Sequence, residues 1–190
     1  LDWSERSTVT LDINSGVYTD TGTVGIAPWD PAMTLVEFDL NGAFDVQAGD
    51  LVLVGDGVIT KTLTVTGLVV TDVDELSDTV SGTTDTTGLA VNVWVHEDYE
   101  TSLVTVLPDG GSGDWSAPLP YDIVPGMDGA AVQPDEDGDV TWINWTAGTT
   151  EQGQISTEAV MARLPMAGYS GTGYTLETTG NRGSDRFIPI

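Results

Sequence analysis

The chain has 190 residues, of which 30 are Asp or Glu, 5 are Lys or Arg, one is His and none is Cys, so its net charge is −25. Such a surface repels phosphate backbones and acidic lipid headgroups, which excludes nucleic acid as a partner. The lack of Cys excludes disulfides and thiolate metal sites, and a single His excludes a His-rich zinc or iron centre. The remaining chemistry is that of carboxylates, hydroxyls and hard cations.

The length fits one large domain or two small ones. Apolar residues make up 39% of the chain and charged residues 18%, so the chain can bury a core in spite of its net charge. No apolar run in the sequence approaches the roughly 18 residues of a membrane span, and we therefore expect no membrane insertion.

A hydrophobic period of two dominates the chain, with Thr, Val and Leu alternating between clusters of Gly, Asp and Pro, which is the pattern of β-strands. Gly55-Asp56-Gly57 separates two such runs and predicts a hairpin over residues 50–66. Turn signals recur about every 8 to 12 residues, the spacing typical of an all-β sandwich. In chain order, we expect the other strands at residues 8–13, 34–39, 68–71, 78–82, 90–96, 102–106 and 140–145.

Residues 156–164 form the one stretch with helical signals. A hydroxyl residue can cap its start, Glu158 suits the positive end of the helix dipole, and Pro165 ends it. We expect a short connector helix there.

The chain divides near Gly67, where strand-like residues resume without a Pro-rich or Ser-rich linker. The expected parts are residues 1–67, residues 68–147 and a tail of residues 148–190. Acids thin out in this tail, and three of the four Arg residues lie in it. The tail ends in a short apolar strand candidate that can add to the edge of a neighbouring copy or repeat, through Phe187, Ile188 and Ile190.

The middle of the chain resembles the bacterial immunoglobulin-like repeats of large secreted surface proteins. The resemblance covers residues 68 to about 120 and rests on a Thr-Val-Ser-Gly strand at 79–82, a Val-x-Val strand at 91–95, and a glycine-bearing turn before Trp115. Residues 1–67 look similar to the β-modules that alternate with such repeats. The resemblance implies two stacked immunoglobulin-like β-sandwiches, so the predicted fold is all-β with one short connector helix.

The acidic run at residues 135–139 is the candidate metal site. Asp135, Asp137 and Asp139 stand at alternate positions of a glycine-bearing loop, and Asp128 can complete the ligand set. Ca²⁺ takes six to eight oxygen ligands, so this pattern suits a structural calcium ion. The sequence does not continue as an EF-hand, and a solvated acidic turn is the alternative. A second acidic cluster with the same two readings comprises Asp72, Asp74, Glu75 and Asp78.

Catalytic motifs are weak in this sequence. Asp20-Thr21-Gly22 matches an aspartic protease triplet, but no second copy stands at a suitable spacing, so a turn is the better interpretation. Residues 168–173 only approximate a serine nucleophile elbow, and a triad would have to use His96, the sole His. A pair of glycosidase carboxylates stays open among 30 acids. We predict that the chain is not an enzyme.

Trp142 and Trp145 flank Asn144 near the acidic loop, and their spacing puts them on opposite faces of a strand. An exposed indole beside Asn144 would form a platform for stacking on sugar, so these three residues are the candidate ligand-binding set. The alternative is that the Trp residues pack in the core or along a seam between domains.

Together these features predict a non-catalytic structural or adhesive module of a surface-anchored or fibrous assembly, located outside the cell or at its surface. Its partners would be neighbouring copies or repeats of itself. The alternative is a carbohydrate-binding module of a secreted polysaccharide-active enzyme, with polysaccharide as the partner.

Overall fold

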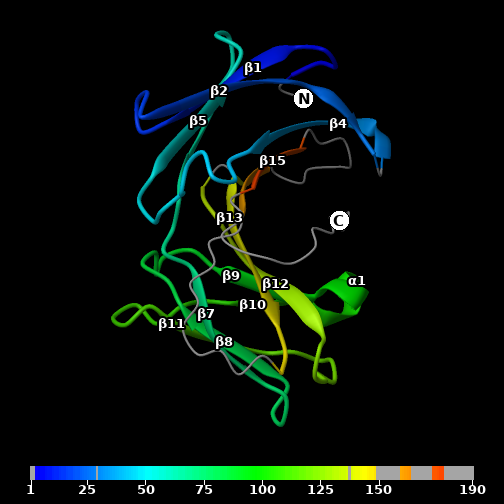
Figure 1. Ribbon diagram of the computed structural model, residues 1–190. Helices are drawn as coiled ribbons and strands as arrows, with labels where there is room; N and C mark the ends of the chain where they lie inside the picture. Colours follow the sequence, from blue (N-terminus) through cyan, green and yellow to red (C-terminus); the bar gives the residue numbers. More distant parts are fainter. Residues whose placement is uncertain (1–2, 29, 137, 149–158, 164–172, 178–190) are drawn as a thin grey trace. The chain divides into compact units, whose positions relative to one another are not determined.

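The computed structural model describes residues 3–28, 30–136, 138–148, 159–163 and 173–177 (Figure 1). The described part consists mostly of β-strands with one short α-helix, which confirms the all-β class. The chain divides into two compact units. The first unit comprises Leu1–Val65, Asp135–Thr141 and Ala159–Arg182, and the second comprises Thr66–Pro134, Trp142–Glu158 and Gly183–Ile190.

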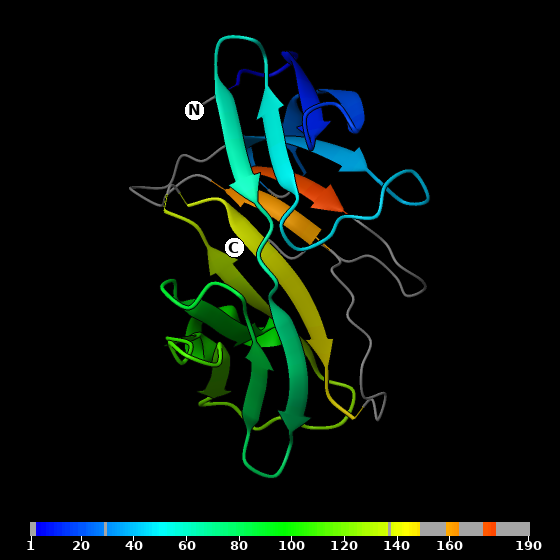
Figure 2. The same ribbon diagram turned by 90° about the vertical axis from the view of Figure 1, so that its left-hand side faces the viewer.

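The first unit contains an antiparallel four-stranded sheet in the order β2-β1-β5-β6. Its strands are β1 (Thr8–Ile13), β2 (Tyr18–Thr23), β5 (Leu51–Gly55) and β6 (Thr60–Thr64). Every second residue of β1 is buried, because alternate side chains of a strand point to opposite faces. Figure 2 shows the β5–β6 hairpin in cyan.

A second set of strands in the first unit surrounds β4 (Asp30–Asp39). Strand β3 (Gly25–Ala27) pairs with β4 in the antiparallel sense, whereas β15 (Gly173–Glu177) pairs with it in parallel. Strand β14 (Ala159–Arg163) pairs with β15 in the antiparallel sense. The core of this unit is formed by Trp3, Val9, Leu11, Ile13, Val24, Val36, Phe38, Leu40, Val46, Val52, Val54, Leu63 and Val65.

The expected connector helix at residues 156–164 is wrong for its described part. Residues 159–163 form strand β14, and residues 156–158 and 164 lie outside the described residues. A helix of about two turns is marginal without tertiary support, so a ladder of hydrogen bonds to β15 can override local helical propensity. The α-helix of the described chain is α1 (Tyr99–Ser102), which follows the single 3₁₀ turn η1 (His96–Asp98).

The second unit contains a three-stranded antiparallel sheet in the order β11-β8-β7. Its strands are β7 (Val69–Asp74), β8 (Thr79–Thr83) and β11 (Asp114–Pro118). The β7–β8 hairpin is the green pair of strands in Figure 2. Gly82 is required in β8, since a Cβ there would lie 2.4 Å from the Trp115 ring of β11.

The other strands of the second unit follow the order β10-β9-β12-β13. They are β9 (Val91–Val95), β10 (Val104–Val106), β12 (Asp128–Pro134) and β13 (Val140–Thr146), of which the first two residues of β13 group with the first unit. The buried core of this unit is formed by Leu68, Val80, Val91, Val93, Val95, Trp115, Ala117, Leu119, Ile123, Ala131, Ile143, Trp145 and Ala147.

Each unit carries the same turn ahead of its third sheet strand. In the first unit, the Gly49 amide donates to the Val65 carbonyl at 2.8 Å and the Val65 amide donates to the Asp50 carbonyl at 2.9 Å. In the second unit, the Gly126 amide donates to the Ala147 carbonyl at 2.9 Å, and the Ala147 amide donates to the residue after Gly126 at 2.7 Å. Both glycines have positive φ, +88° and +85°. The two units therefore repeat one turn.

The sheets that contain this turn also agree in register. Ile13 pairs with Val52 in the first unit, and Val95 pairs with Gly129 in the second. Val52 and Gly129 each stand three positions after the shared glycine. The order β2-β1-β5-β6 thus repeats as β10-β9-β12-β13, strand for strand.

The two units meet in the chain between Val65 and Thr66, close to the expected boundary at Gly67. The described strands of residues 148–190 pair with the first unit and do not stand as a separate tail. Phe187, Ile188 and Ile190 lie outside the described residues. Among the described helices, none is long and apolar enough to cross a membrane.

Candidate functional site

Three strands and one helix of the second unit place aromatic and polar side chains on the face of the sheet opposite its core. Alternation along β9 sends Val93 and Val95 into the core and Trp94 to the other face. Alternation along β13 sends Ile143 and Trp145 into the core and Trp142 to that same face. We call this set the aromatic face; it comprises Trp94, His96, Tyr99, Asp128, Trp142 and Asn144.

The rings of the aromatic face hold one another in fixed orientations. Trp94 contacts Trp142 edge to face, with ring centroids 4.9 Å apart and planes at 85°. It contacts Tyr99 of α1 in the same way at 5.2 Å and 86°. The His96 ring lies over Trp142 at 6.4 Å and 24°. Edge-to-face pairs are the favoured aromatic geometry, so Trp142 is partly buried and held in place.

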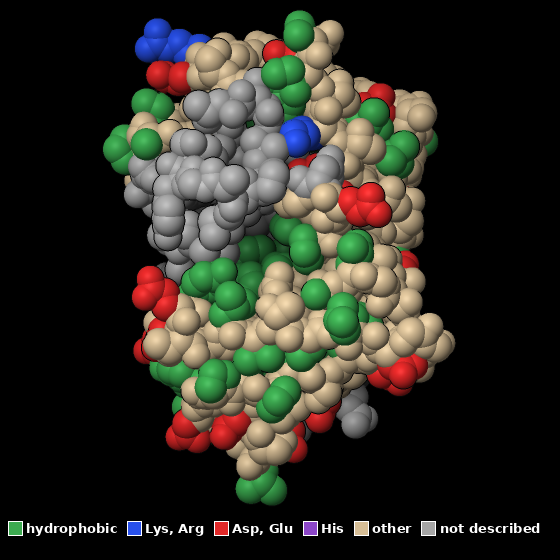
Figure 3. Space-filling view, turned by 180° about the vertical axis from the view of Figure 1, so that it is seen from behind, with side chains coloured by type: hydrophobic (Ala, Val, Ile, Leu, Met, Phe, Trp, Pro, Cys, Tyr) green, Lys and Arg blue, Asp and Glu red, His purple; other side chains and the backbone are tan. Residues whose placement is uncertain are grey.

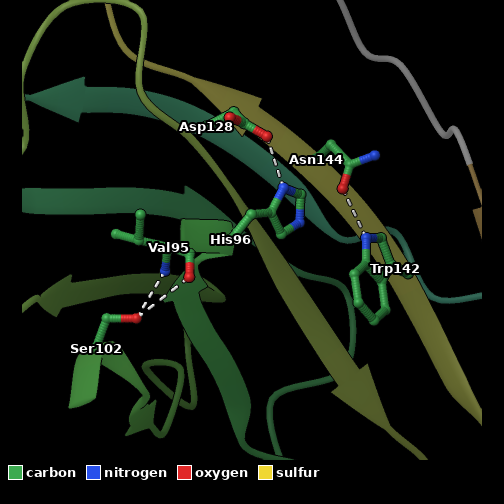
Figure 4. A network of polar contacts seen from close by, with 6 residues as sticks. All are labelled: Val95, His96, Ser102, Asp128, Trp142 and Asn144. Atoms are coloured by element: carbon green, nitrogen blue, oxygen red, sulfur yellow. Dashed lines mark hydrogen bonds and ion pairs between the residues drawn. The ribbon is translucent and has the colours of Figure 1, made fainter. Parts of the chain in front are cut away.

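Hydrogen bonds fix the polar members of the face. The Trp142 indole Nε1–H donates to Asn144 Oδ1 at 2.7 Å, and in Figure 4 the amide nitrogen of Asn144 points away from the indole. His96 Nδ1 lies 2.7 Å from Asp128 Oδ2, with the His side chain 12% and the Asp side chain 62% exposed. The exposed carboxylate and amide beside a fixed indole can bind hydroxyl groups, the chemistry that sugar recognition requires.

A hydrolytic triad is not assembled around His96 among the residues drawn in Figure 4. The hydroxyl of buried Ser102 accepts a hydrogen bond from the Val95 amide at 2.9 Å and donates to the Asp98 carbonyl, so it ties α1 to β9. His96 contacts Asp128 and Trp142 instead. This arrangement positions the histidine in a contact surface and gives it no nucleophile.

The aromatic face is specific to the second unit. Trp142 precedes Ala147 by the same five positions as Thr60 precedes Val65, so Thr60 is its counterpart in the first unit. By the matching register, Asp12 is the counterpart of Trp94. The first unit folds around the same sheet with polar residues at these positions, so the aromatic side chains are not required by the shared fold.

The structure does not bring the four predicted metal ligands together. Asp128 begins β12, whereas Asp135 follows its other end. In the loop, Asp135 Oδ1 accepts from the Asp139 amide at 2.9 Å, and the Asp135 amide donates to the Asp139 carbonyl at 2.8 Å. Asp139 is buried, and Asp137 lies outside the described residues. Within the described ranges, no three His, Asp or Glu side chains group as metal ligands, and calcium binding stays a prediction.

Many acids instead close turns. Asp74, from the second predicted acidic cluster, accepts hydrogen bonds from the Ser77 hydroxyl and the Leu76 amide, which lower the pKa of its carboxyl. Asp109 accepts from the Ser112 and Gly111 amides, which lower its pKa in the same way. These contacts favour the charged carboxylate and hold the turn, so the acids act in local structure.

The predicted ligand-binding set is divided by the sheet. Trp142 and Asn144 share the aromatic face, whereas Trp145 is buried in the core on the other side. Trp94 and Tyr99 were absent from the predicted set. The alternation of Trp94 with core valines was a usable signal, but the position of Tyr99 depends on the fold of α1 back onto β9.

The chain matches no family model, no curated protein and no solved structure.

Proposed function

We propose that the chain is a non-catalytic structural or adhesive module of an extracellular, surface-anchored or fibrous assembly, built from immunoglobulin-like β-sandwiches. The observation that carries this proposal is the repetition of one four-stranded sheet, with its turn and register, in both units. Repeated modules of one design are typical of extended proteins that act as spacers or contact surfaces.

The strand order of the second unit supports the immunoglobulin-like assignment. Its first, second and fifth strands form one sheet, β11-β8-β7, and its other four strands form β10-β9-β12-β13. The two halves of an immunoglobulin-like sandwich exchange strands in this way, with a core between them. The buried residues of both sheets belong to a single cluster, as such a sandwich requires.

The assembly role is tested by measuring the mass of the purified chain against concentration with light scattering and analytical ultracentrifugation. We expect association that grows with concentration, and we expect deletion of residues 186–190 to reduce it if the apolar end adds to a neighbour's edge. A double substitution of exposed Val17 and Val58 to Ser, both at turns of the first unit, is the control. A chain that stays monomeric throughout would contradict the role.

The second candidate function, glycan binding, is favoured by the aromatic face. Trp142, Asn144 and Asp128 combine a fixed ring with exposed polar groups, and the first unit has no aromatic residue at the matching position of β6. A ring that the fold does not need is a reason to assign it a binding role.

Glycan binding is tested by titrating soluble polysaccharides while recording tryptophan fluorescence. We expect a saturable change that Trp142→Phe reduces in amplitude and Asn144→Ala weakens by about tenfold, the effect of roughly 1.4 kcal/mol. Thr62→Ala, at the matching position of β6, is the control and should change nothing. An identical response from the Trp142→Phe variant would exclude the aromatic face.

A further inference from the structure

Strand β4 of the first unit and β11 of the second unit occupy the same place in the repeated module. A buried leucine directly follows each strand, Leu40 after β4 and Leu119 after β11, and the shared turn comes next in both units. Counting back from these leucines, Val36 corresponds to Trp115, and both side chains are buried. The two strands therefore present matching backbone edges.

The neighbours of these two strands differ. Strand β11 pairs in the antiparallel sense with β8, which precedes it in the chain. Strand β4 has β3 on one side and β15 on the other, and β15 pairs with it in parallel. Parallel pairs are slightly less stable per residue than antiparallel pairs, and β15 reaches β4 only by closing a loop of more than a hundred residues. These two costs make β15 an exchangeable neighbour.

We propose that the edge of β4 occupied by β15 is a strand-acceptor site that takes, in the antiparallel sense, the β7–β8 hairpin of a second copy of this chain. The exchange replaces the ladder between β8 and β11 by an equivalent ladder between β8 and β4. Domain swapping of this kind costs little, because the donated element makes the same type of contacts in its new place.

The side chains of β8 suit this edge. Val80 and Gly82 point into the core of the second unit, while Ser81 lies between them on the outer side. Along β4, Val36 and Phe38 are buried and Glu37 is exposed. The two alternations match, so a donated β8 can place its apolar residues over the core of the first unit and its hydroxyls in solvent.

The register of the exchanged pair follows from the native one. Ser81 pairs with Ser116, and its hydroxyl donates to the Ser116 hydroxyl at 3.0 Å. The counterpart of Ser116 in β4 is Glu37. In the exchanged pair, Ser81 therefore stands opposite Glu37, and its hydroxyl can donate to the carboxylate.

The probe is a fluorescent synthetic peptide of residues 68–84, added to the whole chain while anisotropy is recorded. We expect saturable binding that Ser81→Pro in the peptide abolishes, because proline disrupts the extended ladder. The chain has no Cys, so register is tested with Glu37→Cys in the chain and Ser81→Cys in the peptide. Directly opposite residues bring Cβ atoms within about 5 Å, and a disulfide should form.

Two controls separate strand addition from collision. A Val80→Cys peptide, whose thiol points to the other face, should cross-link at least tenfold more slowly. A chain with Glu37→Cys and Thr175→Cys, which pair in register across β4 and β15, should bind less peptide when oxidised than when reduced.

Absence of saturable binding, or equal cross-linking of both peptides, would overturn the acceptor site. Either result would leave the glycan and assembly measurements unaffected, since those depend on the aromatic face and on the terminal residues.

Discussion

Aspartates at turns explain much of the acid content of this chain. Asp12, Asp56, Asp74, Asp98 and Asp109 each accept a hydrogen bond from a backbone amide two to four positions ahead. Such a contact replaces a water that the amide would otherwise bind and holds the turn in one geometry. The acids are therefore part of the local structure as well as of the surface charge.

The lowered pKa values of these carboxyls predict loss of stability in acid. The Ser112 and Gly111 amides lower the pKa of Asp109, and the Ile59 and Val58 amides lower that of Asp56. A carboxyl whose folded pKa lies below its unfolded value, about 3.9, adds stability above that pH, and this stability is lost as the pH falls through the folded pKa.

We expect Asp109→Asn, which keeps an acceptor oxygen but cannot titrate, to lower the melting temperature near neutral pH. The difference from the unchanged chain should shrink below about pH 4, where both side chains are neutral. Thermal melts across this range check the expectation, with Glu136→Gln at an exposed loop position as the charge control. A difference that stays constant with pH would contradict the role of the carboxylate.

At the scale of elements, the repeated turn sets the entry of the third strand of each four-stranded sheet. Val46 and Ile123, three positions before the shared glycine, are both buried in the core of their unit. The glycine then reverses the chain with positive φ, which an L-residue with a side chain rarely adopts. The turn thus connects core packing directly to strand register.

The glycines of this turn should be equally sensitive to substitution. A Cβ at Gly49 or Gly126 would meet no atom within 4 Å, so the cost of Ala is the backbone strain alone, about 1 to 2 kcal/mol at each site. Gly88→Ala, also without close neighbours but without positive φ, should change stability by less than about 0.5 kcal/mol. Chemical denaturation measures all three, and unequal losses at Gly49 and Gly126 would contradict a shared turn.

At the scale of the whole molecule, the net charge of −25 is the dominant electrostatic feature. Figure 3 shows the acidic side chains at several separate places on one face, with few basic ones. Self-repulsion of this kind opposes the compact state and keeps the chain soluble. Exposed charges lose most of this repulsion when salt shortens the Debye length from about 30 Å at 0.01 M to about 8 Å at 0.15 M.

We therefore expect the melting temperature to rise with NaCl concentration over this range. CaCl₂ at equal ionic strength should raise it further if Asp135 and Asp139 take part in a calcium site, and a chelator should remove that excess. A melting temperature that falls with NaCl would show that repulsion does not limit stability. Equal effects of the two salts would contradict the calcium prediction.

The sequence by itself determined the all-β class, the core side of most strands and the separation of Trp142 from Trp145. These properties follow from a local period of two, which the backbone geometry of a strand imposes wherever the strand packs. The hairpin predicted over residues 50–66 also follows from local turn chemistry and is present as β5 and β6. Strand β12 was missed, because its Gly-Ala-Ala run has little strand propensity and is held by pairing with β9.

Only the tertiary structure decided the features that depend on distant residues. It made residues 159–163 a strand, by pairing with β15, and it put Asp128 beside His96 and away from Asp135. It also revealed the repeated sheet, which the two units share in hydrogen bonds and register although few residues are identical. Backbone pairing is insensitive to most side chains, so a register can persist where the residues that fill it have changed.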